Sequence, residues 1–419
     1  MSRKEQNRLV VLNEMNRGNL TVDQTATLLN LSPRHVFRLL AAYRKEGASA
    51  LAHGNRGRTP YNALGLALKK QVQDLASTKY SGFNHQHFTE KLAENEGIEL
   101  SRSSVCRFLM EAGIRSPRQR RPPKHRSRRE RYPQEGMMLQ TDGSPHDWLE
   151  GRGPKLCLIG AIDDATNIVA YVFFQEQEDS RGYILMLKGI VQTKGIPRAI
   201  YHDRHSIFEV SADKLPSIEE QLEGKRPTTQ VGRIMQELGI TSIPANSPQA
   251  KGRIERLWGT FQDRLASELR LAGAKTVEEA NEVVAVFLPM YNRKFGIDAR
   301  EPGSAYRKLP AGFKPEEVFC FKYQRTVGAD NVVRFGEHRR QILPSEYRLS
   351  YARCRVQVHK RLDDSLAVYF QGHHLDTVSA PFEPAKLREP VLAGADTQRH
   401  YAKPAPDHPW RGKYRTFFD

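Results

Sequence analysis

Apolar residues recur at helical spacing along the first part of the chain. The segments 8–17, 21–30 and 33–44 each place apolar side chains on one side of a helix. Thr21 and Ser32 are helix-capping residues at the starts of the second and third segments. Two helices joined by a short turn, with basic residues early in the second, are typical of a helix-turn-helix. A plain helical hairpin is the alternative. The candidate DNA contacts are Arg34, His35 and Arg38.

The same pattern returns over residues 63–114. Helical spacing covers 64–76 and a short segment at 88–93, and Ser101 begins a third helix. Arg102 and Ser103 lie at the start of that third helix, where small polar and basic side chains suit contacts with phosphates and bases. We therefore expect a second helix-turn-helix.

From residue 137 the pattern changes to short apolar strands separated by helices. Such an order predicts a mixed α/β sheet. The predicted strands are 137–142, 156–162, 168–174, 199–203 and 240–244, and the predicted helices are 181–194, 231–238, 250–271 and 276–300.

Between about residues 317 and 375 the chain alternates apolar and polar residues in several short runs. Short alternating strands predict a small antiparallel β-barrel. The tail after residue 381 is rich in proline and basic residues, and we expect no stable structure there in isolation.

The expected architecture is multidomain, with all-α helix-turn-helix units, a central α/β core and a small C-terminal β-barrel. The expected segments are 1–52 (helix-turn-helix), 53–62 (basic linker), 63–114 (second helix-turn-helix), 115–134 (basic arm), 135–300 (catalytic core), 315–378 (β-barrel) and 379–419 (basic tail).

Charge is concentrated in the first third of the chain. The net charge is +17, and residues 1–131 alone hold 25 Lys and Arg against 11 Asp and Glu. A basic segment attached to a nearly neutral remainder favours a polyanionic partner, although a basic solvated surface is the alternative. The basic linker and arm add candidate DNA contacts at Arg56, Arg58, Arg118, Arg120, Arg121, Lys124, Arg126 and Arg128.

Other features limit the class of protein. The four cysteines are far apart and form no CxxC pair, which argues against a disulfide framework or a structural zinc site. No apolar run reaches the roughly 18 residues of a membrane-spanning helix, and the N-terminus has no signal-peptide pattern. We expect a cytoplasmic protein with no membrane partner.

Three acids stand out by their position. Asp142 and Asp203 end predicted strands, and Glu255 lies in the first turns of a predicted helix. Carboxylates aimed at one point form an all-oxygen cluster that suits Mg²⁺ or Mn²⁺. A turn cap, a strand-end salt bridge and a surface acid are the respective structural alternatives. Asp163 and Asp164 are rival acids, but a turn explains them.

The amino-acid sequence around these acids resembles that of transposases of the retroviral-integrase superfamily, most closely the ISNCY-type insertion-sequence transposases. The matching stretches are LQTDGSPHDWLEGRGP, IYHDRHSIF and NSPQAKGRIERLWGTFQDRL. The resemblance implies an RNase H-like core, with Asp142, Asp203 and Glu255 as catalytic acids that bind two Mg²⁺ ions, for which Mn²⁺ can substitute. It also implies a bacterial, nucleoid-associated protein that acts on double-stranded DNA as a homo-oligomer, at least a dimer.

One feature departs from the family pattern. Asp203 and Glu255 are 52 residues apart, a wider separation than in many members. The extra residues, roughly 210–229, are polar and are expected to form an inserted surface segment. Beside Glu255, Lys251 and Arg253 are expected to contact DNA phosphates, and a solvated helix start is the alternative.

The sequence therefore predicts a DDE transposase. It would bind the terminal inverted repeats of an insertion sequence, nick DNA and transfer strands into target DNA by two-metal-ion phosphoryl transfer. A DNA-binding repressor with an inactive core and an RNase H-like nuclease that only hydrolyses are the competing interpretations.

Overall fold

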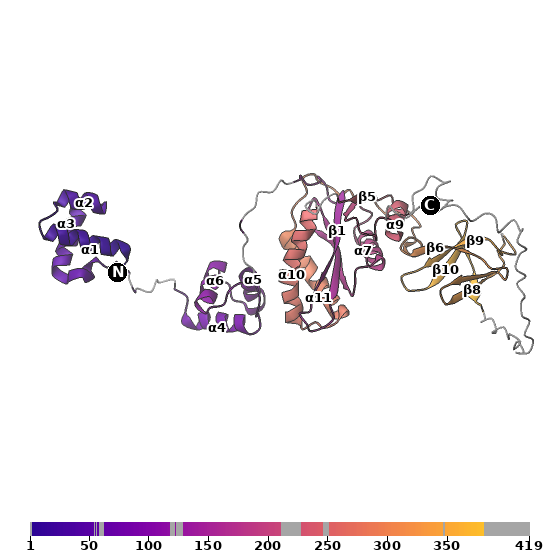
Figure 1. The fold of residues 1–419 in the computed structure, drawn as a ribbon, viewed down its shortest axis with the longest axis horizontal. Coiled ribbons are helices and arrows are strands. Elements are labelled where there is room, and N and C mark those ends of the chain that lie inside the picture. Colours follow the sequence, from indigo (N-terminus) through magenta and orange to yellow (C-terminus); the bar gives the residue numbers. More distant parts are fainter. Residues whose placement is uncertain are drawn as a thin grey trace, which may run out of the picture. The chain divides into compact units, whose positions relative to one another are not determined.

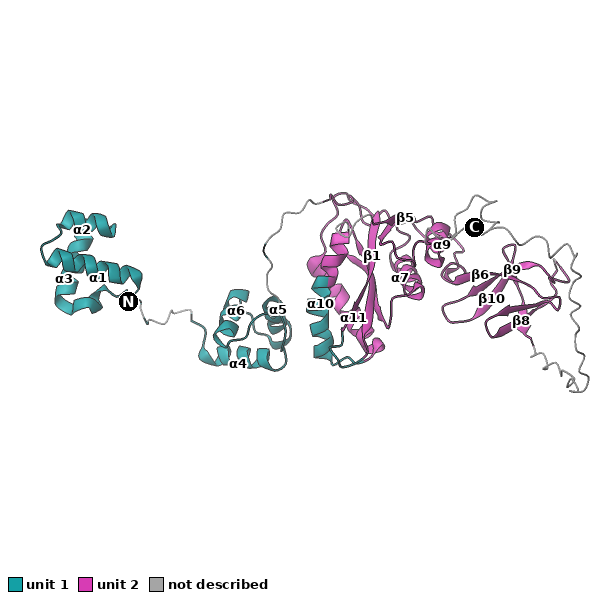
Figure 2. Cartoon of the chain, viewed as in Figure 1, with its two compact units in different colours: residues 1–127, 148–153, 259–275 teal, residues 128–147, 154–258, 276–419 magenta. Residues whose placement is uncertain are grey.

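The computed structural model describes residues 2–53, 55, 57, 63–117, 122, 129–210, 228–245, 251–346 and 348–380. The chain forms two compact units (Figures 1 and 2). Unit 1 comprises residues 1–127, 148–153 and 259–275, and unit 2 comprises residues 128–147, 154–258 and 276–419. The expected insertion lies largely outside the described residues, because 211–227 are not among them.

The first helices of unit 1 are capped as the sequence predicts. They are α1 (Arg3–Asn16), α2 (Val22–Leu29) and α3 (Pro33–Glu46), followed by the 3₁₀ helix η1 (Gly47–Leu51). The side chains of Thr21 and Ser32 accept hydrogen bonds from backbone N–H groups at the starts of α2 and α3, which confirms both predicted caps. A small apolar core formed by Leu12, Ala26, Val36, Leu40 and Leu51 holds these helices together.

A second set of helices follows in unit 1. It consists of α4 (Leu66–Ser77), α5 (His85–Glu96) and α6 (Arg102–Glu111). Ser101 caps α6 as predicted, because its hydroxyl accepts from the backbone N–H of Ser104. Helix α5 begins three residues before the predicted start at Phe88, because Asn84 caps it by accepting from the backbone N–H of His87. The polar first turn of α5 has no apolar residue to reveal it.

Unit 2 is built on a five-stranded mixed sheet, which confirms the predicted α/β core. Its strands are β1 (Met138–His146), β2 (Leu156–Asp163), β3 (Val169–Gln175), β4 (Ala199–His202) and β5 (Thr241–Pro244). Their order is β3-β2-β1-β4-β5; β1, β2 and β3 pair antiparallel, whereas β4 is parallel to both β1 and β5. The associated helices are α7 (Ser180–Thr193), α9 (Gln230–Glu237), α10 (Gly252–Ala272) and α11 (Val277–Phe295).

Helices cover the sheet, with α7 on one side and α11 on the other (Figure 1). Residues of α7 and α9, such as Tyr183, Leu187 and Ile234, share a buried core with strand residues such as Leu139 and Ile159. Helix α11 also covers the exposed edge of β3. The side-chain amides of Asn281 and Asn292 each donate to and accept from the β3 backbone, at Phe174 and Val169. The edge strand is therefore unavailable to another chain at these positions.

The C-terminal strands differ from the expected barrel. After the short helix α12 (Pro315–Val318) come β6 (Phe321–Thr326), β7 (Val332–Phe335), β8 (His338–Ile342), β9 (Arg355–Lys360), β10 (Leu366–Phe370), β11 (His373–Leu375) and β12 (Thr377–Ser379). They form two open sheets, β11-β10-β9-β6 and β12-β8-β7.

The chain passes between the two sheets three times, from β6 to β7, from β8 to β9 and from β11 to β12. The turn from Val327 to Asn331 takes it from β6 to β7 without a ladder between them in the part of the chain that is described. Asp376 alone separates β11 of one sheet from β12 of the other. Val333, Ile342, Val358 and Val368 from both sheets meet in one apolar core, so the domain is a small sandwich of open sheets.

Helix α10 binds α5 through buried charges within unit 1. Glu268 Oε1 lies 2.7 Å from His87 Nε2 and 2.9 Å from Lys91 Nζ. Arg264 donates to both carboxylate oxygens of Glu90, at 2.6 and 3.3 Å. The side chains of Glu268, His87 and Lys91 are each at most 12% exposed, so the pairs are shielded from solvent screening.

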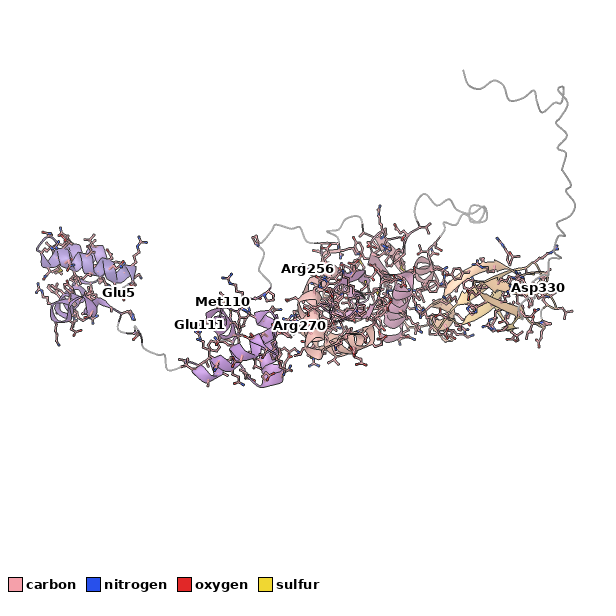
Figure 3. The ribbon with its side chains drawn as sticks, turned by 60° about the horizontal axis from the view of Figure 1, so that its bottom comes forward. Glu5, Met110, Glu111, Arg256, Arg270 and Asp330 are labelled. Atoms are coloured by element: carbon pink, nitrogen blue, oxygen red, sulfur yellow. The ribbon has the colours of Figure 1, made fainter. Side chains whose placement is uncertain are left out.

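A further ion pair on α10 holds the segment 148–153. Arg270, labelled in Figure 3, donates to both oxygens of Glu150 at 2.7 and 2.8 Å. The forked guanidinium matches the two carboxylate oxygens, which fixes orientation as well as distance. Trp148 and Leu149 in this segment are fully buried. The Arg270–Glu150 pair therefore joins a buried segment to the later turns of α10.

The structure gives the burial of the four cysteines and the character of the helices. Cys157 and Cys320 are buried, Cys106 and Cys354 are half-buried, and all four are free thiols. Burial raises the pKa of Cys157 to about 12, so this thiol stays protonated and unreactive at neutral pH. Among the helices that the structure describes, none has the length and apolar character of a bilayer-spanning segment.

We predict that Glu268→Gln loosens α5 from α10. The substitution leaves Lys91 and His87 without their buried carboxylate, which we expect to cost about 3 kcal/mol. Burial by itself raises the pKa of Glu268, but the hydrogen bonds from His87 and Lys91 outweigh it and place that pKa below its usual 4.5. The stabilisation is therefore present above pH 4.5 and is lost as the pH falls through the lowered value.

Amide hydrogen exchange of α5 and α10, read by mass spectrometry at pH 7, measures this effect. Glu94→Gln is the matched control, because Glu94 contacts Lys91 at 3.2 Å from a half-exposed position. Equal exchange in the two variants would contradict the prediction. So would a gap between the melting temperatures of wild type and Glu268→Gln that stays constant below pH 4.

Candidate active site

Asp142 and Asp203 occupy matching positions on the neighbouring strands β1 and β4. Asp203 directly follows β4, whereas Asp142 lies within β1, which continues to His146, so the expectation that Asp142 ends its strand is wrong. Strands β1 and β4 are parallel, with Gln140 opposite Tyr201, and each aspartate follows two residues later. The side chain of Asp142 is 22% exposed and that of Asp203 is 44% exposed. Equal spacing from a shared register therefore brings two predicted site residues together, with both carboxylates accessible.

A single buried lysine contacts both aspartates. Lys251 Nζ donates to Asp142 Oδ1 at 2.7 Å and lies 3.8 Å from Asp203 Oδ2. The side chain of Lys251 is only 9% exposed. A positive charge thus stands between two carboxylates that would otherwise repel each other. The structure places this lysine against the acids, and its predicted contact with DNA phosphates stays a prediction.

Glu255 lies in the first turn of α10, which is hydrogen-bonded to β1. The backbone N–H of Ile254 donates to Gln140 Oε1 at 3.4 Å. Trp258, one turn after Glu255 on the same helix face, donates its indole N–H to Asp142 Oδ2 at 3.2 Å. Glu255 itself is exposed, as is its neighbour Arg256, which Figure 3 labels. The helix start therefore contacts the strand that carries Asp142.

The donor set suits a hard divalent cation. Carboxylate oxygens are the ligands that Mg²⁺ and Mn²⁺ prefer, and Asp142 and Asp203 already face one positive group, the Lys251 ammonium. Within the described ranges no three Asp, Glu, His or Cys side chains are close enough to form a metal cluster. Glu255 thus lies on α10 as predicted, but its carboxylate is not close enough to Asp142 and Asp203 to share a metal ion with them.

The two histidines beside Asp203 serve its geometry. His202 is fully buried and stacks on Phe208, and its ring nitrogens contact the Asp203 carbonyl at 2.5 Å and the Ser242 hydroxyl at 2.7 Å. Burial lowers the pKa of His202, so the ring is neutral at pH 7. The backbone N–H of His205 donates to Asp203 Oδ1 at 3.2 Å. These contacts hold the strand end and the carboxylate in place.

Three neighbours of Asp142 were not identified from the sequence. The helical spacing of Trp258 with other apolar residues indicates only core packing, although its N–H is polar and a buried indole needs an acceptor. Gln140 offered no signal, because its partners lie far away in sequence. Glu178 lies beside Gly143, where an added Cβ would be 2.5 Å from the Glu178 carboxyl carbon, so a side chain at residue 143 would displace the Glu178 carboxylate.

The predicted DNA contacts on the helical units are exposed or half-exposed, whereas those at the start of α10 are not. Arg34 and Arg38 are exposed on α3 and His35 is half-exposed, while Arg102 and Ser103 are exposed at the start of α6. Arg253 differs, because its side chain is 12% exposed and pairs with Asp164 at 2.8 Å. The remaining candidates lie outside the described residues: Arg56, Arg58, Arg118, Arg120, Arg121, Lys124, Arg126 and Arg128.

Comparisons with known proteins give relatives over most of the chain. Residues 8–64 match the family model "Winged helix-turn helix". The "Putative transposase y4bF" of Sinorhizobium fredii is 33% identical over 378 residues, which cover 90% of this chain and 80% of that protein. The "Transposase for insertion sequence IS1202" of Streptococcus pneumoniae is 30% identical over 376 residues, covering 82% of this chain and 78% of that protein.

Two solved structures are similar in part. One is the intasome of simian T-cell lymphotropic virus in complex with PP2A regulatory subunit B56 gamma, with a TM-score of 0.30 and 14% identity, covering 74% of this chain and 100% of that chain. The other is the HTLV-2 integrase catalytic core domain in complex with magnesium, with a TM-score of 0.28 and 16% identity, covering 44% of this chain and 97% of that chain.

We predict that Lys251→Met strengthens Mn²⁺ binding in the absence of DNA. The ammonium and a divalent ion compete for the same carboxylates, and two unit charges about 4 Å apart interact by about 4 kcal/mol at an effective dielectric constant of 20. Removing the ammonium should therefore tighten Mn²⁺ binding by at least about tenfold.

Titration calorimetry with Mn²⁺ measures the change. Lys194→Met is the control, because Lys194 pairs with a single carboxylate, that of Glu135, at 3.4 Å on the surface of the same unit. An affinity for Mn²⁺ that is unchanged or weaker in Lys251→Met would show that the lysine does not compete with the metal.

Proposed function

Because the chain belongs to the insertion-sequence transposases, we propose that it is a DDE transposase that binds terminal inverted repeats, nicks DNA and transfers strands into target DNA. The observation that carries the proposal is the pair of carboxylates, Asp142 within β1 and Asp203 directly after β4, that face one positive group. Glu255 is one turn from Trp258, which contacts the same Asp142 carboxylate. The sheet order β3-β2-β1-β4-β5 supports the RNase H-like core that the resemblance implies.

Asp142, Asp203 and Glu255 are the proposed ligands of two Mg²⁺ ions, for which Mn²⁺ can substitute. When bound, such a pair of ions activates the attacking oxygen and stabilises the leaving 3′-oxygen. The chain supplies carboxylates whose orientation is already fixed: Asp142 by the Trp258 indole N–H, and Asp203 by the backbone N–H of His205. Little reorganisation of these two ligands is then needed during the reaction.

Both proposed steps are in-line attacks at phosphorus. In the first, water attacks the phosphodiester at the element end, the P–O bond to the 3′-oxygen breaks, and a free 3′-hydroxyl results. In the second, that hydroxyl attacks a phosphodiester of the target, a new P–O bond forms, and the target strand leaves through its own 3′-oxygen. Since each end must be held while its partner reacts, we propose a homo-oligomer, at least a dimer, on double-stranded DNA.

DNA recognition is proposed for the helical units and the basic arm. The starts of α3 and α6 present Arg34 and Arg102 at the surface, and the first unit matches a helix-turn-helix family. The domain limits given from the sequence remain our proposal for how these functions are divided. Both named relatives come from bacteria, which supports a site of action on the nucleoid in the cytoplasm.

We predict that Asp142→Asn and Glu255→Gln abolish strand transfer and leave end binding intact. Each substitution removes a proposed ligand, and the lost stabilisation of several kcal/mol slows the reaction by at least about a hundredfold. The assay uses a labelled duplex that carries the element's own end, with Mg²⁺ or Mn²⁺, and separates cut from joined products. Asp298→Asn and Glu282→Gln are matched controls, because both acids are exposed in unit 2.

The outcomes of this assay separate the competing functions. Joined product from wild type and both controls, but from neither site variant, supports the transposase. Cutting without joining indicates a nuclease. End binding without cutting under either metal indicates a DNA-binding repressor and overturns the proposal.

A second prediction concerns the contacts with the phosphate backbone. Arg34→Ala should lower the slope of log affinity against log salt concentration by about 1, because one fewer phosphate is neutralised. Fluorescence anisotropy with the element end at several salt concentrations measures the slope. Arg17→Ala is the control, since Arg17 is 72% exposed directly after α1 and pairs with Glu14. Identical slopes in wild type and Arg34→Ala would show that Arg34 does not contact a DNA phosphate.

A further inference from the structure

Asp164 is a buried carboxylate at the end of β2, with its side chain 0% exposed. Its Oδ1 accepts from Arg129 at 2.5 Å, Arg253 at 2.8 Å and Gln140 at 2.9 Å. Its Oδ2 accepts from the backbone N–H of Tyr132 at 3.0 Å. A buried carboxylate with four donors is a fixed point rather than a solvated surface charge.

The four donors come from three parts of unit 2. Arg129 and Tyr132 end the basic arm, Gln140 lies on β1, and Arg253 lies in the first turn of α10. Arg129 is half-exposed, whereas Arg253 is nearly buried. One carboxylate therefore ties the arm, the central strand and the helix start to the same place.

The neighbouring acid shows that the turn itself does not need Asp164. Asp163 Oδ1 accepts from the backbone N–H groups of Ala165 and Thr166, and its Oδ2 accepts from Gly136. These bonds form the turn that the sequence predicts. The charge of Asp164 is directed instead to two arginines that come from distant parts of the chain.

Two of the donors, Gln140 and Arg253, lie two residues before proposed metal ligands in the sequence. Gln140 precedes Asp142 by two residues, so both side chains lie on the same face of β1. The Gln140 side chain accepts from the backbone N–H of Ile254, the residue between Arg253 and Glu255. Asp164 thus holds the turn of α10 that carries Glu255 and the glutamine next to Asp142.

We propose that Asp164 is a positioning residue that sets Glu255 relative to Asp142 through Arg253 and Gln140. This inference rests on the proposed function, because the two acids it positions are proposed metal ligands. Residues that orient ligands without touching the metal commonly change metal affinity by about 10–100-fold when they are substituted. Asp164 does not contact the DNA or the ion in this role.

The test substitutes Asp164→Asn in the full chain and measures Mn²⁺ affinity by titration calorimetry, with the melting temperature recorded in parallel. The amide keeps the shape of the carboxylate but removes its charge, which leaves the Arg253 guanidinium unpaired. We expect Mn²⁺ affinity to fall by about tenfold or more, with unchanged affinity for the element end. The double variant Asp164→Asn with Arg253→Gln should recover part of the Mn²⁺ affinity, because a neutral pair can hydrogen-bond again.

Asp163→Asn is the matched control, since it removes the adjacent buried carboxylate, which accepts from the turn and from the Gly136 backbone but not from Arg253 or Gln140. It should lower the melting temperature without changing Mn²⁺ affinity. If Asp164→Asn behaves in the same way, Asp164 is merely structural and the inference is wrong. Arg253→Gln tests the same link from the helix side if Asp164→Asn does not fold; a wild-type Mn²⁺ affinity in Arg253→Gln would also overturn the inference.

Asp142→Asn separates failure of this inference from failure of the proposed function. If Asp142→Asn abolishes Mn²⁺ binding and Asp164→Asn leaves it unchanged, only the positioning role is overturned. If Mn²⁺ affinity is the same in wild type and Asp142→Asn, the site does not bind the metal, and the proposed function and the inference both fail.

Discussion

The mutual repulsion of two carboxylates brought together by the neighbouring strands β1 and β4 is the constraint to which the surrounding residues are adapted. The parallel register of β1 and β4 fixes Asp142 and Asp203 as neighbours whatever their side chains prefer. Two negative charges held close together are tolerated only beside a compensating positive charge or hydrogen-bond donors. Lys251 supplies the charge, and the Trp258 indole and the His205 backbone supply donors.

The same principle orders the next layer of charges. Asp164 is buried with two arginines, so its negative charge is compensated inside the protein and is not available at the site. In unit 1, the buried Glu268 is compensated by Lys91 and approached by His87. A buried charge without its partner costs more free energy than a buried pair contributes to stability. Each pair therefore specifies the arrangement of its elements more strongly than it stabilises them. Charge pairing thus fixes where α10 begins and which face of α5 it contacts.

Local patterns predicted much of the fold, because caps and periodicity depend on neighbouring residues. Thr21, Ser32 and Ser101 cap helices as expected, and all five strands of the mixed sheet lie close to their predicted positions. The expected barrel was wrong in its closure, because alternation identifies strands but not their partners. The three connections between the sheets, one of them the single residue Asp376, carry no comparable pattern.

The candidate acids could be located from the sequence only as far as strand ends and motif resemblance allow. Asp142 and Asp203 are both predicted to end strands, and the structure brings them together. Only Asp203 follows its strand, because β1 continues past Asp142 to His146. Asp163 and Asp164 looked alike in the sequence as turn acids, yet only Asp163 forms the turn. The two acids differ because Arg129 and Arg253 donate hydrogen bonds to Asp164. These arginines lie 35 and 89 residues away from Asp164 along the chain.

Lys251 joins the sequence prediction to the structure. From the sequence it was placed against DNA phosphates, and in the structure it is against Asp142 and Asp203. Under the proposed function these are two positions of one flexible side chain, because an ammonium and a divalent ion cannot both occupy the space between the carboxylates. Metal binding would release the lysine at the place where a phosphodiester must be held. A lysine has the long stem and compact charge that such an exchange requires, whereas a rigid guanidinium suits the fixed pair of Arg253 and Asp164.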